Sequence, residues 1–126
     1  MGMRQPDTPR LLNGRVGKVI FLPGAVGAAD FWRPVGALLP AAWEKTYLAW
    51  PGLGAEPPDP GVHGFDDLVR LVEAELTEPS TLVAQSMGGI VAVRVALRHP
   101  GKVRRLVLVA TSGGVDVELL GGADWR

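Results

Sequence analysis

Ser86 lies where a short apolar run, Leu82-Val83-Ala84-Gln85, leads directly into a second apolar segment that begins at Met87. If the first is a strand and the second a helix, one sharp turn joins them, and its central residue takes a strained backbone with positive φ. The residues two positions to either side must be small because strand and helix nearly collide there, and Ala84 and Gly88 are small. This geometry predicts that the Ser86 hydroxyl is open at the carboxyl end of a sheet, beside the free N–H groups that begin the helix. Such a hydroxyl could attack a carbonyl, and those N–H groups would stabilise the negative oxygen that forms.

A serine hydroxyl is a weak nucleophile until a base removes its proton. The chain has two histidines, His63 and His99. His99 lies at the far end of the helix that would begin at the serine, roughly 20 Å away at 1.5 Å per residue, and is excluded as the base. His63 precedes the serine in a loop, where we interpret it as a surface residue rather than as the base.

The elements that would position Ser86 begin with four predicted strands. Each is a short run rich in apolar or β-branched residues that is followed by glycine or proline or by a helical pattern. The predicted strands span residues 16–22, 45–50, 81–85 and 103–110.

Three helices are expected between these strands. The first would start at Asp30 as N-cap and stop at Pro40, with Phe31, Val35, Leu38 and Leu39 on its buried face. The second would bury the face formed by Phe65, Leu68, Val72 and Leu76, and the third would run from Met87 to His99.

The third helix is the contested element, because Val91, Val93, Val95 and Leu97 alternate like a strand. We interpret it as a helix, since Arg94 and Arg98 are four residues apart and share one helical edge. A strand here would also follow the previous strand too closely for a parallel crossover.

Strands that alternate with helices imply a parallel sheet covered by helices on both faces, joined by right-handed crossovers. The chain length corresponds to one domain. The fold class is therefore α/β.

The segment around Ser86 resembles the nucleophile elbow of the α/β-hydrolase family, whose pattern Gly-x-Ser-x-Gly appears here with Ala84 in the first position. Four other segments of the chain also resemble the family and occur in the family's order. They are Pro23-Gly24, Phe31-Trp32, Pro51-Gly52-Leu53-Gly54 and His99-Pro100. Together they cover about residues 16 to 114. The family usually has histidine where Pro23 stands, and aspartate where Ala49 stands.

The resemblance implies an oxyanion hole formed by the backbone N–H groups of Ala25 and Met87, with Ser86 as nucleophile. In this family the acid and the histidine follow the serine. Only His99 follows it here, and Asp116, just past the last predicted strand, is a possible acid or a solvated residue.

The resemblance also implies a catalytic domain about twice as long as this chain. We therefore expect a partial α/β-hydrolase fold, with a parallel sheet of about four strands and with the cap and last strands absent. Residues 1–15 would be a flexible arm, 16–114 the N-terminal half of the core, and 115–126 the truncated start of the cap or next element.

Composition excludes several other classes of protein. The formal net charge is zero and there is no cysteine, so neither nucleic acid binding nor a thiolate metal site is indicated, and no metal or cofactor is expected. No apolar run approaches the roughly 20 residues that cross a bilayer, and the N-terminus lacks the apolar region of a signal peptide, so we expect a cytoplasmic protein without membrane partners. Gly52 and Gly54 could suggest a nucleotide-binding loop, but Pro57 replaces the third glycine.

We therefore expect a hydrolase that uses Ser86 to cleave an ester, thioester or similar small acyl substrate. The alternative is a non-catalytic fragment or interaction module, which could self-associate through an open sheet edge.

Overall fold

The computed structural model describes residues 17–111 of the 126-residue chain. The predicted arm (residues 1–15) and the predicted start of a further element (115–126) lie outside the described residues. Four parallel strands form one sheet in the order β2-β1-β3-β4. They are β1 (Lys18–Leu22), β2 (Glu44–Tyr47), β3 (Ser80–Gln85) and β4 (Val103–Val109). The predicted four-stranded parallel sheet is confirmed.

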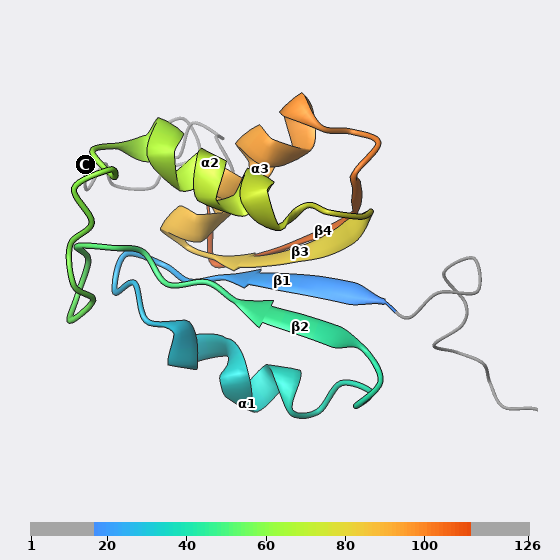
Figure 1. Ribbon diagram of the computed structural model, residues 1–126. Coiled ribbons are helices and arrows are strands. Elements are labelled where there is room, and N and C mark those ends of the chain that lie inside the picture. Colours follow the sequence, from blue (N-terminus) through green and yellow to red (C-terminus); the bar gives the residue numbers. More distant parts are fainter. Residues whose placement is uncertain (1–16, 112–126) are drawn as a thin grey trace, which may run out of the picture.

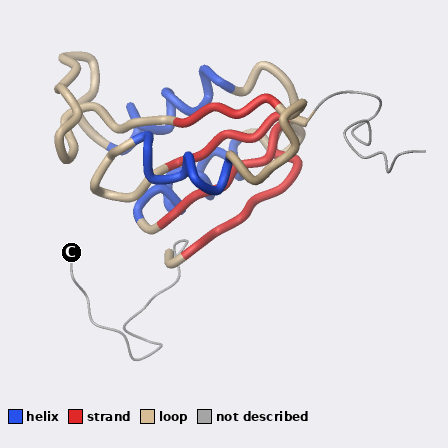
Figure 2. Tube along the Cα trace, turned by 90° about the horizontal axis from the view of Figure 1, so that it is seen from below, coloured by secondary structure: helices blue, strands red, loops and turns tan. Residues whose placement is uncertain are grey.

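Helices cover both faces of this sheet, as expected (Figure 1). One face carries the 3₁₀-helix η2 (Ala29–Trp32) and the short α1 (Arg33–Gly36). The other carries α2 (Phe65–Glu75) and α3 (Met87–Arg98). Figure 2, which looks onto the sheet from below, shows the strands side by side.

The helix predicted from Asp30 to Pro40 is wrong in length and in orientation. Trp32 and Gly36 are buried, and the predicted core residue Leu39 packs partly buried against the same cluster. The other predicted core residues, Phe31, Val35 and Leu38, are 52%, 42% and 85% exposed. The segment begins as a 3₁₀-helix, which has three residues per turn, so the 3.6-residue spacing does not apply. The residue at its N-cap is Ala28, and Asp30 lies within the first turn, where it pairs with Arg33 at 2.7 Å.

The contested segment is a helix, as predicted. Val91, Ala92 and Val95 of α3 are fully buried against the sheet and α2. Arg94 lies on the opposite edge, where its Nη1 is 3.0 Å from the carboxylate oxygen Oδ1 of Asp66 in α2. The four-residue spacing of the arginines was therefore the better indicator than the alternation of valines.

The core has two parts, one on each face of the sheet. The larger lies under α2 and α3, and the smaller contains Val19, Phe21 and Trp32 under η2. The larger cluster consists of Ile20, Leu22, Trp50, Leu68, Val69, Val72, Leu76, Leu82, Ala84, Val91, Ala92 and Val95.

The strand order places a switch point between β1 and β3. The chain leaves β1 toward β2 on one side, and it leaves β3 toward β4 on the other. In open parallel sheets, ligands bind in the crevice that these diverging connections leave at the carboxyl ends of the strands. The residues that follow Leu22 and Gln85 therefore form the candidate site.

Candidate active site

Ser86 lies at the carboxyl end of β3, immediately before the first residue of α3. Its φ is 53° and its ψ is −123°, so the predicted positive φ is confirmed. A non-glycine residue in such a conformation costs about 1–3 kcal/mol, which the surroundings must offset. Two hydrogen bonds hold the Ser86 backbone in this conformation. The Ser86 N–H donates to the Val109 carbonyl at 3.0 Å, and the Gly89 N–H donates to the Ser86 carbonyl at 2.9 Å.

The small residues on either side of the serine are required for different reasons. Ala84 is fully buried under the helices. A Cβ at Gly88 would collide with the Pro23 carbonyl oxygen and lie 3.0 Å from that of Leu22. Gly88 therefore lies against the end of β1, and the need for a small residue here agrees with the prediction.

Gly24 brings the loop after β1 against the serine. A Cβ added to this glycine would lie 3.1 Å from the Ser86 Cβ and 2.5 Å from the Gln85 Oε1, a distance too short to persist unless the Gln85 side chain moves. The loop after β1 and the turn after β3 are thus in direct contact at the switch point.

Two tryptophans fix the start of this loop. The Trp50 Nε1–H donates to the Pro23 carbonyl at 2.8 Å, and the Trp32 Nε1–H donates to the Leu22 carbonyl at 2.9 Å. This role of the two tryptophans was not predicted from the sequence. The sequence offered only a general indication of it: the N–H of a buried indole needs a hydrogen-bond acceptor, and the loop after β1 provides backbone carbonyls.

The two predicted oxyanion donors lie on the two segments that meet here. Met87 is the first residue of α3, so its N–H belongs to the helical turn that has no intrahelical acceptors. Ala25 is exposed in a turn that is closed by a hydrogen bond from the Gly27 N–H to the Gly24 carbonyl at 3.0 Å.

The structure separates the two histidines. His99 caps the far end of α3, where its Nε2 lies 2.6 Å from Glu73 Oε2, which agrees with its exclusion as the base. His63 is an exposed loop residue, as predicted, and precedes α2. Its backbone N–H donates to Asp67 Oδ2 at 2.7 Å, and this bond is the main cause that lowers the pKa of Asp67. Asp116 lies outside the described residues.

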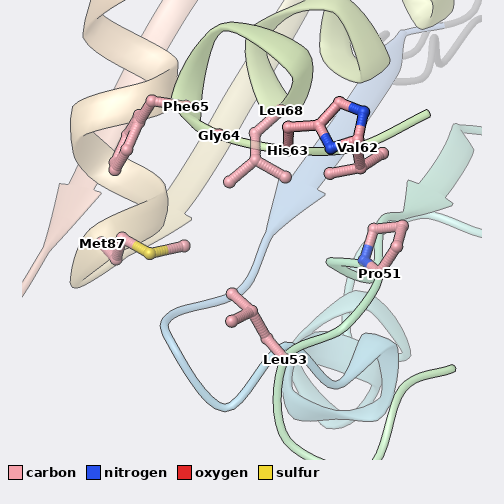
Figure 3. Close-up of a pocket in the computed structure, with 8 residues that line it drawn as sticks. All are labelled: Pro51, Leu53, Val62, His63, Gly64, Phe65, Leu68 and Met87. Atoms are coloured by element: carbon pink, nitrogen blue, oxygen red, sulfur yellow. The ribbon is translucent and has the colours of Figure 1, made fainter. Parts of the chain in front are cut away.

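A cavity of about 240 Å³ adjoins Met87 (Figure 3). Loop residues between β2 and α2 and the start of α2 form most of its wall. Its lining consists of Pro51, Leu53, Val62, His63, Gly64, Phe65, Leu68 and Met87. This cavity was not predicted from the sequence, because residues that are distant in sequence form it.

The loop at Gly52 and Gly54 has a structural explanation. Both glycines have positive φ, 81° and 57°, and a side chain at Gly54 would overlap the Val26 carbonyl. No helix starts at this loop, since the next one, α2, begins at Phe65. A dinucleotide-binding loop leads into a helix whose N-terminus binds the phosphates. This loop does not, so it is not a nucleotide site of that kind.

Within residues 17–111, no group of three or more histidine, cysteine, aspartate or glutamate side chains is arranged to hold a metal ion. The helices of the same stretch include none with the length and hydrophobicity needed to cross a bilayer.

Comparison with known proteins points to one family. The family model described as "Alpha/beta hydrolase family" matches residues 19–126. The pimeloyl-[acyl-carrier protein] methyl ester esterase of Pseudoalteromonas atlantica is 37% identical over 82 residues, 64% of this chain and 32% of that protein. The enzyme of the same name from Aromatoleum aromaticum is 37% identical over 95 residues, 75% and 37% of the two chains.

A solved structure agrees in fold. The monoacylglycerol lipase of Paleococcus ferrophilus superimposes with a TM-score of 0.64 at 23% identity, over 76% of this chain and 39% of the lipase. This chain thus spans about a third of the length of the two esterases it matches.

Proposed function

The chain belongs to the alpha/beta hydrolase family, and on this basis we propose that it is a serine hydrolase in which Ser86 attacks an ester, thioester or similar small acyl substrate. The observation that carries the proposal is the strained backbone of Ser86, at φ 53°, between the end of β3 and the start of α3. Strained conformations persist mainly where function needs them. We infer that the Ser86 hydroxyl faces the crevice at the carboxyl ends of the strands.

The proposed mechanism uses groups at the switch point. The Ser86 hydroxyl oxygen attacks the substrate carbonyl carbon, and the carbonyl oxygen becomes negative. The N–H groups of Met87 and Ala25 donate hydrogen bonds to that oxygen, and removing one such donor typically costs 10²–10³-fold in rate. The acyl group is transferred to Ser86, the alcohol or thiol leaves, and water then releases the acid.

The serine proton needs an acceptor in this mechanism. His99 lies at the other end of α3, where it is hydrogen-bonded to Glu73, so it cannot accept the Ser86 proton. His63 lines the cavity that also contains Met87 and is the histidine to be varied in a test.

Among the acyl substrates, esters are favoured. Both curated relatives described above are methyl ester esterases. Thioesters and other acyl compounds remain within the proposed class because the site chemistry is the same: attack on a carbonyl by a serine and stabilisation of an oxyanion.

Labelling with a fluorophosphonate probe tests the proposal. We expect the purified chain to be labelled, Ser86→Ala to lose the label, and Ser80→Ala to keep it. Ser80 is the matched control because it lies at the opposite end of β3 from the elbow. If His63 is the base, His63→Ala slows labelling and leaves circular dichroism unchanged. A folded chain that takes no label contradicts the proposal and favours a non-catalytic interaction module.

A further inference from the structure

A second strained residue lies beside Ser86. In the part of the chain that the structure describes, the other non-glycine residue with positive φ is Ala110, at 51°. Ala110 directly follows β4 as Ser86 directly follows β3, and these strands pair in parallel with Gln85 opposite Val109. The two strained residues are therefore neighbours at the carboxyl edge of the sheet. Strained conformations persist only where the surroundings hold them, and they gather at functional sites.

The turn at Ala110 places the next side chain, that of Thr111, against α3. A Cβ added to Gly89 would collide with the Thr111 Oγ1 and lie 2.5 Å from its Cγ2. Thr111 therefore occupies the space that a side chain at position 89 would need. Gly89 is the third residue of α3, so the segment that follows β4 touches the first turn of this helix.

These contacts close a ring around Ser86. Its N–H donates to the Val109 carbonyl at 3.0 Å, and its own carbonyl accepts a hydrogen bond from the Gly89 N–H at 2.9 Å. Val109 and Gly89 are also joined to each other, because Ala110 leads from Val109 to Thr111 and Thr111 packs on Gly89. The backbone of the serine is thus attached to the end of β4 on one side directly and on the other through Gly89.

We propose that Ala110 and Thr111 are positioning residues for Ser86, an inference that rests on the proposed role of this serine as nucleophile. The left-handed backbone of Ala110 directs Thr111 onto the first turn of α3, and Thr111 prevents that turn from moving toward β4. The Ser86 hydroxyl and the Met87 N–H then keep a fixed relation to each other. This relation matters because a displacement of about 1 Å can slow a reaction about a hundredfold.

The kinetics of fluorophosphonate labelling test the role of Thr111. Thr111→Ala removes the two atoms that lie nearest Gly89, and we expect it to lower the maximal rate of labelling about tenfold or more. The probe concentration that gives half of this rate should stay unchanged, because no group that binds the probe is lost. Thr111→Ser keeps the hydroxyl oxygen beside Gly89 and should retain most of the rate. A residue that only stabilises the fold would not separate these two constants.

Variants of Ala110 test the role of its backbone conformation. Ala110→Gly allows positive φ without steric cost, so the labelling rate should be retained and the melting temperature should not fall. Ala110→Val places a β-branched side chain where positive φ is strongly disfavoured, so labelling should slow as in Thr111→Ala. Ala41→Gly is the matched control for the glycine variant, since Ala41 is exposed and precedes β2 at the opposite edge of the sheet. It should lower the melting temperature and leave labelling unchanged.

Hydrogen exchange followed by NMR tests the inference without requiring catalysis. We expect the amide protons of Ser86 and Gly89 to exchange about tenfold faster in Thr111→Ala than in the wild type, because their hydrogen bonds open more often. The amide protons of β1 should exchange at the wild-type rate. A folded Thr111→Ala chain that exchanges and is labelled like the wild type overturns the inference.

The outcomes for the inference and for the proposed function differ. If the wild type is labelled and folded variants of both residues are labelled equally fast, the proposed function stands and the positioning role is wrong. If exchange at Ser86 and Gly89 rises as expected but the folded wild type takes no label, Ala110 and Thr111 hold the turn as inferred and the proposed serine chemistry is wrong.

Discussion

At the scale of single residues, the site depends on two glycines that let the loop after β1 approach Ser86. A side chain at Gly24 would meet the movable end of Gln85, whereas one at Gly88 would meet the backbone carbonyls of Leu22 and Pro23. A side-chain amide can rotate away, but a carbonyl at the end of a buried strand cannot. The two positions should therefore respond differently to the same change.

We predict that Gly88→Ala destabilises the fold by about 1–3 kcal/mol, as overpacking of a rigid site does. Gly24→Ala should cost less stability but should slow the labelling of Ser86, because its methyl group lies against the serine. Urea denaturation gives the first effect and fluorophosphonate kinetics the second. Equal stability losses in the two variants would contradict this account of Gly88.

The tryptophans allow a matched comparison at the same scale. Trp50→Phe removes the donor to the Pro23 carbonyl and leaves that buried oxygen without its 2.8 Å partner. We predict a loss of about 1–3 kcal/mol and slower Ser86 labelling, because a buried unsatisfied group is costly and the loop that carries Ala25 loses an anchor. The measurements are again urea denaturation and labelling kinetics.

Trp43→Phe is the control for that variant. Among the residues that the structure describes, the Trp43 Nε1–H is buried without a hydrogen-bond partner. Its removal should therefore cost less than the removal of the Trp50 N–H. A larger loss in Trp43→Phe would show that ring packing, and not the hydrogen bond, dominates both effects.

At the scale of elements, the start of α2 links the cavity wall to pH. Asp67 accepts hydrogen bonds from the N–H groups of His63 and Gly64 and pairs with Arg70, and these interactions lower its pKa below the ordinary value of 3.8. A carboxyl whose folded-state pKa is lowered stabilises the fold above its unfolded pKa, and that contribution is lost as pH falls through the folded value.

We predict that Asp67→Asn lowers the melting temperature at pH 7 and that its difference from the wild type begins to shrink below about pH 4, where the carboxyl of the unfolded chain takes up its proton while that of the folded chain still resists protonation. Thermal unfolding at pH 7 and at pH 3, followed by circular dichroism, measures both differences. A variant that is equally destabilised at the two pH values would show that the carboxylate charge does not stabilise the start of α2.

The elements also show what the sequence could predict. Strands and long helices were found because their apolar patterns persist over several residues, and α3 was identified through Arg94 and Arg98. The segment from Asp30 failed because a 3₁₀ turn and a four-residue helix carry too few residues to display a period, and because Trp32 takes the core position. The positive φ of Ser86 was predictable because the turn from β3 to α3 is local in sequence. The tryptophan anchors and the cavity were not, because they join residues that only the fold brings together.

At the scale of the whole molecule, β4 is the border of the sheet that the structure describes. Within residues 17–111 it pairs with β3 alone. Val107, Leu108 and Val109 of this strand are 44%, 40% and 42% exposed, although they are apolar. An exposed, apolar edge strand pairs readily with another strand.

We propose on this basis that the 126-residue chain self-associates through β4. An antiparallel pairing related by a two-fold axis would place Arg104 and Arg105 of one copy opposite the apolar end of the other, so that like charges do not meet. We predict a monomer–dimer equilibrium in sedimentation experiments, shifted toward monomer by Val107→Lys, because a charge on an edge strand opposes pairing. Leu38→Lys, a similar change at an exposed residue away from the sheet edge, should leave the equilibrium unchanged. A chain that stays monomeric at every concentration, or dimers that tolerate Val107→Lys, would show that β4 is not the contact.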